Sequence, residues 1–151
     1  MQFFGQGRVA HGRPAHAAAL KVWRSAVGEA GRVAMEAAGR ALLSGPVAVE
    51  VVFFLERPLV HHRGRRRSHP VRGDAPTLNA TLPDLDKLVR ALLDSLTGVV
   101  WVDDGQVAQV AAVKRYAAPD PLGARVAVWA LADGPPAVVT LDLDLDEEGD
   151  A

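Results

Sequence analysis

Cysteine is absent from this chain of 151 residues. The absence excludes a disulfide scaffold, a zinc site with thiolate ligands and a cysteine nucleophile, and it is compatible with a reducing compartment. No apolar run reaches the ~18 residues that a membrane-spanning helix needs. The segment from Met1 to Gly5 lacks the basic and apolar regions of a secretory signal. Together these absences predict a cytoplasmic protein with no membrane partner.

The net charge is small, at −1, but the charges are unevenly distributed along the chain. Six acidic residues lie between positions 142 and 150, and removing them from the 18 acidic residues leaves 12, against 17 basic ones. The sequence therefore predicts one domain over residues 1–141 and an acidic, solvated tail over residues 142–151. A concentrated basic segment comprises Arg57, Arg63, Arg65, Arg66, Arg67 and Arg72.

Hydrophobic periodicity predicts two main helices. Residues 15–43 are rich in helix-forming residues, with a break expected near Gly28 or Gly31. Residues 83–97 show the clearest pattern, because the leucines fall on one face and the charged residues on the other. Strands are expected at residues 2–5, 47–55, 99–102, 106–116, 124–131 and 138–145. This order favours an α+β single domain, with a mixed β-sheet flanked by the two helices.

The segment between residues 56 and 82 is polar and rich in proline and arginine. A loop of this length inside a compact domain is usually functional or disordered. Its arginines are candidates for contact with the phosphates of a nucleic acid. The five histidines of the chain lack metal-ligand spacing and are read as non-ligands.

Two short acidic motifs frame the second helix. Asp84 and Asp86 stand at its beginning, and Asp103 and Asp104 form a turn after Trp101. Taken alone, each has a structural explanation as a helix cap or a hairpin turn. If the turn returns toward the beginning of the helix, however, the carboxylates cluster, and protons or a cation must offset their repulsion. Hard oxygen ligands favour Mg²⁺ or Mn²⁺, which can activate a water for phosphodiester hydrolysis.

The stretch PDLDKLVRALLDSLTGVVWVDDGQV, residues 83–107, resembles the signature segment of the RusA family of Holliday-junction resolvases. The shared features are a D-x-D at the start of a helix, a basic residue about four positions later, and a D-D-x-Q-V turn after an aromatic residue. Weaker similarity extends to Leu20–Arg24, Glu56–Pro58 and Lys114–Tyr116.

The resemblance implies a bacterial or phage-encoded, homodimeric, Mg²⁺-dependent endonuclease with a RusA-like fold and no organic cofactor. Its partner would be a four-way DNA junction, resolved by paired nicks in DNA recombination and repair. By position, Asp84, Asp86 and Asp104 match the essential acidic residues, and Asp103 matches a neighbouring acid that is a further candidate metal ligand. Arg90 stands where some members have a catalytic lysine, and Lys87 is the alternative for that basic role. The candidate DNA-binding residues are Arg63, Arg65, Arg66, Arg67, Arg72 and Lys114.

Two other functions remain open on the sequence alone. The chain could be a non-catalytic module that binds DNA junctions or single strands, with structural acids and DNA-binding arginines. It could also be a Mg²⁺-dependent phosphodiesterase acting on RNA or flaps. Cleavage assays with junction, duplex, flap and RNA substrates distinguish the three.

Overall fold

The structure is a computed structural model that describes residues 14–118, 122–132 and 139–144. Its elements are α1 (Pro14–Ala37), β1 (Val47–Leu55), the 3₁₀ turns η1 (Leu59–His61) and η2 (Arg63–Arg65), α2 (Leu85–Leu96), the 3₁₀ turn η3 (Asp104–Gln106), β2 (Val107–Tyr116), β3 (Gly123–Ala130) and β4 (Val139–Asp144). The strand expected at residues 2–5 lies outside the described residues.

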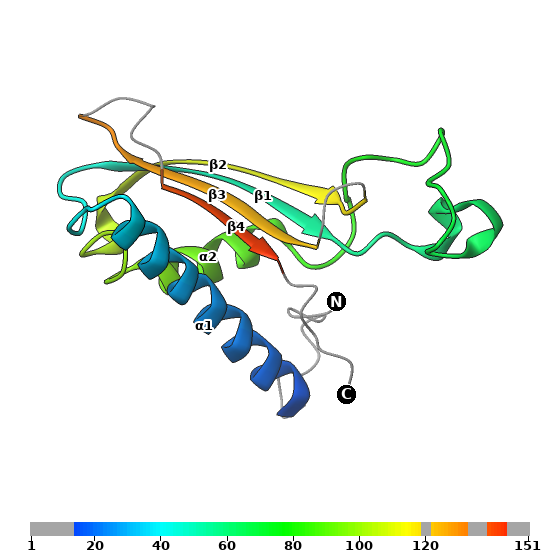
Figure 1. The fold of residues 1–151 in the computed structure, drawn as a ribbon, viewed down its shortest axis with the longest axis horizontal. Coiled ribbons are helices and arrows are strands. Elements are labelled where there is room, and N and C mark those ends of the chain that lie inside the picture. Colours follow the sequence, from blue (N-terminus) through cyan, green and yellow to red (C-terminus); the bar gives the residue numbers. More distant parts are fainter. Residues whose placement is uncertain (1–13, 119–121, 133–138, 145–151) are drawn as a thin grey trace.

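The four strands form one mixed sheet in the order β2-β1-β3-β4. β1 pairs in parallel with β2 and antiparallel with β3, and β3 pairs antiparallel with β4. Both helices lie on the same side of the sheet (Figure 1). The predicted α+β arrangement, with a mixed sheet and two main helices, is therefore confirmed.

The core lies between the helices and this face of the sheet. Alternate residues of β1 from Val47 to Leu55 are buried in the core cluster, as are Leu88, Leu92 and Leu96 of α2. Membership of this cluster alternates along β1, although most of the strand is buried on both faces, as the apolar sequence of residues 47–55 predicts, and it recurs about every 3.6 residues along α2. The amphipathic pattern of the sequence therefore decided which face of each element packs inward.

Two local predictions were wrong. α1 is continuous through Gly28 and Gly31 and ends at Ala37, not near residue 43. A Cβ atom at Gly31 would lie 2.9 Å from Leu96 Cδ2, so the glycine permits the close approach of α1 to α2 and does not break the helix. The expected strand at residues 99–102 is instead part of a turn that begins at Gly98, whose φ is +80°. Within it only Trp101 makes isolated β-bridges, one with Leu43 and one with Thr97.

The topology separates two loops that matter for function. The arginine-rich segment follows the end of β1, whereas the Asp103–Asp104 turn precedes β2. Because β1 and β2 are parallel, these loops lie at opposite ends of the sheet. Figure 1 shows the arginine-rich segment, in green, projecting beyond one end.

The predicted acidic tail begins within the sheet, because β4 extends to Asp144 and Asp142 is in register with Arg125. Residues 145–151 lie outside the described residues, and the domain boundary stays a prediction. Among the described helices, none combines the length and apolar character needed to cross a membrane.

Candidate functional site

The beginning of α2 presents the first acidic motif. Asp84 occupies the N-cap position, as expected, but its side chain makes no capping hydrogen bond. Its carboxylate instead pairs with Lys87, at 3.1 Å. Asp86, one position into the helix, is exposed. Among the described residues, neither carboxylate therefore accepts a hydrogen bond from the backbone of the helix.

Lys114 on β2 holds the segment that leads into this motif. Its ammonium donates hydrogen bonds to the carbonyl oxygens of Thr81, at 2.5 Å, and Pro83, at 2.8 Å. The Asn79 carboxamide oxygen accepts from the backbone N–H of Thr81, at 2.8 Å. The position of Asp84 thus depends on a lysine 30 residues away in sequence, and that lysine, predicted to bind DNA, is engaged by the protein itself.

A shallow hollow runs along the exposed face of α2. It is lined by Leu85, Asp86, Val89, Arg90, Leu93, Asp94, Asp104 and Ala112. The helical residues recur at intervals of three and four, so they form one stripe about 12 Å long from Asp86 to Asp94. Asp86, Arg90 and Asp104, which were selected from the sequence, therefore share one surface.

Hydrogen bonds of the Asp103 and Gln106 side chains hold the Asp103–Asp104 turn in its conformation. The Asp103 side chain accepts a hydrogen bond from the backbone of Gly105, at 2.8 Å. The Gln106 carboxamide accepts from the N–H groups of Val102 and Asp103 and donates to the carbonyl oxygens of Leu43 and Gly45. These bonds explain why aspartate and glutamine occur at this spacing, and they leave the Asp104 side chain exposed.

The acidic residues do not converge at one point in this chain. Among the described residues, no three histidine, aspartate or glutamate side chains lie close enough to hold one metal ion. The reason is topological: the beginning of α2 is bound to Lys114 near the end of β2, while Asp104 immediately precedes the start of that strand. The expectation that the turn returns to the beginning of the helix is met only in part, because Asp104 shares a hollow with Asp86 but no cluster of three carboxylates forms among the described residues.

The arginine-rich segment has an organised base. Arg57 is only 6% exposed and donates to the carbonyl oxygens of Ala117, at 3.0 Å, and Pro76, at 2.8 Å. Its guanidinium lies 5.1 Å from the centre of the Tyr116 ring. His61 packs edge-on against the same ring, and burial, followed by the charge of Arg57, lowers its pKa. This cluster anchors the loop to the end of the sheet.

The exposed arginines of the loop fall into two groups. Arg67 forms an ion pair with Glu56, and Arg72 forms one with Asp74. Arg63, Arg65 and Arg66 have no ion-pair or hydrogen-bond partner for their side chains among the residues that the structure describes. Three cations are thus left for an external anion.

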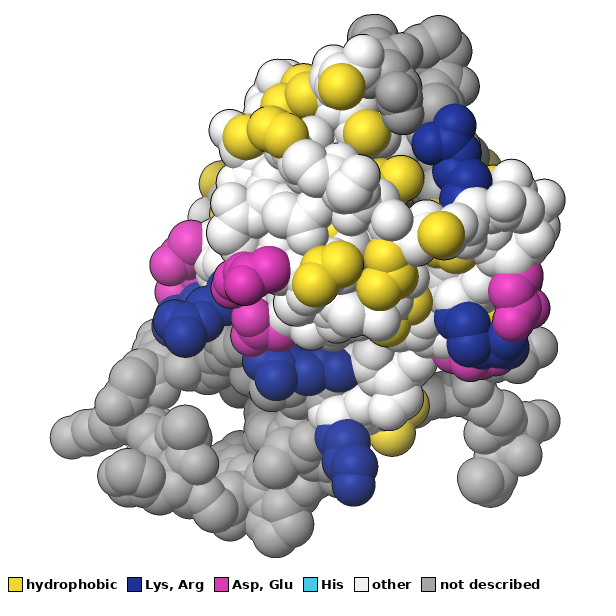
Figure 2. All heavy atoms as spheres, turned by 90° about the vertical axis from the view of Figure 1, so that its left-hand side faces the viewer, with side chains coloured by type: hydrophobic (Ala, Val, Ile, Leu, Met, Phe, Trp, Pro, Cys, Tyr) yellow, Lys and Arg dark blue, Asp and Glu magenta, His cyan; other side chains and the backbone are white. Residues whose placement is uncertain are grey.

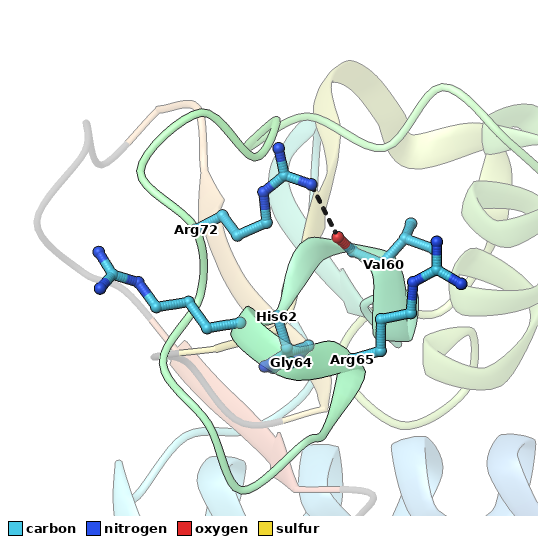
Figure 3. A pocket seen from close by; sticks show the side chains of 6 residues that line it. Val60, His62, Gly64, Arg65 and Arg72 are labelled. Atoms are coloured by element: carbon cyan, nitrogen blue, oxygen red, sulfur yellow. Dashed lines mark hydrogen bonds between the residues drawn. The ribbon is translucent and has the colours of Figure 1, made fainter.

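Two of the unpaired arginines border a second hollow. It is formed by Val60, His62, Arg63, Gly64, Arg65 and Arg72. Figure 3 shows Arg65 and Arg72 reaching out on different sides of the η2 turn, with Arg72 toward the carbonyl oxygen of Val60. By contrast, the opposite end of the molecule bears acidic and basic side chains next to one another (Figure 2). The arginine-rich end is therefore the better surface for a polyanion.

A family model described as Endodeoxyribonuclease RusA matches residues 6–128. The chain belongs to the RusA family. Searches of curated proteins and of solved structures returned no match. RusA enzymes are endonucleases that resolve Holliday junctions, and the family match spans both acidic motifs and the whole arginine-rich segment. The sequence resemblance is thereby confirmed, whereas the role of each residue stays a prediction.

The structure adds residues that sequence reasoning missed. Asp94 lines the hollow with Arg90 and Asp104 and lies 3.6 Å from Arg24. The sequence could have indicated Asp94, because it follows Asp86 by eight residues and therefore lies on the same charged face of α2. Asn79 had no sequence signal, because its role depends on hydrogen bonds within a loop.

Replacing Lys114 by methionine should slow DNA cleavage by about 10- to 100-fold, because small displacements of catalytic groups are costly. Without the ammonium, the Thr81 and Pro83 carbonyl oxygens lose their donor and Asp84 loses its fixed position. The rate of junction cleavage and the salt dependence of junction binding should be measured together. An unchanged salt slope with slow cleavage supports positioning, whereas a flatter slope would show direct phosphate contact.

Proposed function

We propose that this chain is a Mg²⁺-dependent endonuclease that resolves Holliday junctions by paired symmetric nicks in DNA recombination and repair. The observation that carries the proposal is that Asp86, Arg90 and Asp104 line one open hollow in a chain of the RusA family. Carboxylates beside an arginine that has no ion-pair partner among the described residues suit a reaction that needs both a cation and the stabilisation of a phosphate.

The carboxylates have the donor chemistry that Mg²⁺ requires. Mg²⁺ is commonly held by one or two carboxylates, with substrate phosphates and water completing its coordination. Because no three carboxylates of the described residues lie close enough to hold one ion, we propose that one or two of Asp84, Asp86 and Asp104 bind it. Asp103 is a further candidate, although its carboxylate already accepts a hydrogen bond from the backbone of Gly105. The bound ion, with Mn²⁺ as a substitute, would polarise the phosphate and lower the pKa of a water.

Arg90 is the better candidate for the basic role. It lines the hollow and has no ion-pair partner among the described residues, whereas Lys87 is paired with Asp84. A guanidinium remains charged at any working pH, so Arg90 would hold the scissile phosphate and stabilise its developing negative charge. Proton transfer is not a role for this side chain.

The test is the incubation of the protein with a labelled four-way junction, with and without Mg²⁺. Symmetric nicks that depend on the metal would support the proposal. Binding without nicks across metals and sequences would favour a junction-binding or single-strand-binding module. Faster cleavage of flaps or RNA than of junctions would favour another phosphodiesterase.

We also propose that the active form is a homodimer, because two symmetric nicks in a junction call for two sites related by a two-fold axis. β2 is an edge strand whose outer side is bridged by the loop at Leu78 only near its end, at Arg115, and no described strand pairs with its first part. Its first seven residues carry no charge, and Val110 is 41% exposed. An uncharged edge of this kind favours pairing with a second copy.

Replacing Val110 by lysine should shift the protein toward monomer by at least about tenfold in the dissociation constant, because charge on an edge strand opposes pairing. Sedimentation equilibrium at micromolar protein without DNA measures the shift. Val22→Lys, at a 69% exposed position of α1, is the matched control and should leave the equilibrium unchanged. A 16 kDa species for the wild type at every concentration would contradict a stable dimer.

A further inference from the structure

A small polar cavity lies beside the beginning of the acidic motif. It has a volume of about 200 Å³. It opens between the ends of β1 and β2 and the loop before α2, and its walls include Arg57, Asn79, Thr81, Leu82, Pro83 and Tyr116. Neither the metal site nor the proposed phosphate contacts use it.

The cavity is adjacent to the hollow that holds Asp86. Ala112, Lys114 and Tyr116 alternate along β2 and therefore point to the same face of the sheet. Ala112 lines the hollow, Tyr116 lines the cavity, and Lys114 lies between them, bound to the carbonyl oxygens of the loop. The two positions on β2 are about 13 Å apart at the usual rise of a strand.

Two nearly buried side chains bring hydrogen-bond donors to this cavity. Asn79 is 7% exposed, and its carboxamide oxygen is committed to the N–H and hydroxyl of Thr81, so its orientation is determined. No described residue accepts a hydrogen bond from its amide nitrogen. Arg57 is 6% exposed, and its guanidinium pairs with no described carboxylate. The amide nitrogen of Asn79 and the positive charge of Arg57 are thereby available to a ligand that offers acceptors.

The walls favour a flat, partly apolar ligand over a bare phosphate. Leu55, Pro58, Leu82 and Pro83 contribute apolar surface, and Tyr116 contributes an aromatic ring. Arg67, the other cation at the cavity, is neutralised by Glu56. Arginine and asparagine are also the side chains that most often bind acceptor atoms on the edges of nucleobases.

We propose that this cavity binds one nucleobase, taken out of the stack next to the exchange point of the junction, through acceptor atoms that face Asn79 and Arg57. The proposal rests on the proposed function, because it needs a DNA junction at the neighbouring carboxylates. Enzymes that read an extruded base use such a combination of hydrogen bonds and flat apolar walls. The consequence is that this cavity, through Asn79 and Arg57, is where the protein distinguishes one base from another.

The variant Asn79→Asp tests the proposal. It keeps the oxygen that accepts from Thr81 and replaces the amide donor by an acceptor. Ala80→Asp is the matched control, because it adds the same charge at an exposed neighbour that does not line the cavity. Each protein is given a panel of junctions that differ only in the base pairs at the exchange point. Affinities are measured without Mg²⁺ and cut sites with Mg²⁺.

The wild type and Ala80→Asp should prefer some sequences by about tenfold or more. Asn79→Asp should lose this preference, to within about twofold, or favour a different base. Leu82→Trp, which narrows the cavity and leaves Asn79 intact, should also flatten the preference and guards against misfolding of the first variant. Equal loss of affinity for all sequences would indicate a phosphate contact and overturn the proposal, as would an unchanged preference.

The same experiment separates this inference from the function on which it depends. Metal-dependent junction cleavage by the wild type without sequence preference would reject the base-binding cavity and keep the resolvase. If the wild type neither binds nor cuts junctions, both proposals are wrong.

Discussion

Asp86→Asn should lower the rate of junction cleavage by at least about 100-fold while leaving junction affinity unchanged or slightly higher. The substitution removes a metal ligand but also a negative charge that would face the DNA phosphates. Because Asp86 is exposed and forms no ion pair or hydrogen bond among the described residues, the loss of its charge should not lower the stability of the fold. Single-turnover cleavage, junction binding and thermal unfolding measure the three effects.

The matched control is Glu50→Gln. Glu50 is exposed on β1 and alternates with the buried residues that face the helices, so it lies on the other side of the sheet. Its neutralisation changes the net charge by the same amount without touching the hollow. Cleavage near the wild-type rate by Asp86→Asn, or an equal reduction with Glu50→Gln, would reject the metal assignment.

The second large effect should come from the three unpaired arginines. Replacing Arg63, Arg65 and Arg66 together by alanine should weaken junction affinity by at least about tenfold near physiological ionic strength. It should also flatten the plot of log affinity against log salt by up to about three units, close to one for each phosphate that the variant no longer neutralises. All DNA structures should be affected alike, because phosphate contacts carry no sequence information.

Arg67→Ala and Arg72→Ala provide controls within the same loop. Each of these arginines is already paired with a carboxylate of the protein, so its removal releases fewer DNA counterions. Their salt slopes should stay near that of the wild type. If the triple variant keeps the wild-type slope, the loop does not bind DNA.

Much of the fold was predictable from local patterns. The mostly buried strand β1 follows from the apolar run of residues 47–55, and the leucine face of α2 follows from the period of the helix. Any short window of sequence contains both patterns. The two acidic motifs and the arginine-rich loop were visible for the same reason, since each is a cluster of like residues within a few positions. The predicted break in α1 was wrong because Gly31 permits the close approach of Leu96. That contact joins residues far apart in sequence, so no local window contains it.

The sequence by itself determined the family, the α+β class and the set of candidate residues. Only the tertiary structure decided which candidates are free. Asp103 is occupied by its own turn, Lys114 binds carbonyl oxygens of the loop, and Arg67 is paired with Glu56, whereas Asp104 and Arg90 are left exposed to the hollow.

The physical reason is that a charged side chain is engaged or free according to groups that are distant in sequence. The bond from Gln106 to Leu43 spans 63 residues, and the bond from Lys114 to Pro83 spans 31. The place of the second acidic motif likewise depends on the pairing of strands. Because β1 and β2 are parallel, Asp104 lies at the opposite end of the sheet from the arginine-rich loop. Residue type and spacing specify the available chemistry, but the pairing of strands specifies where each group stands.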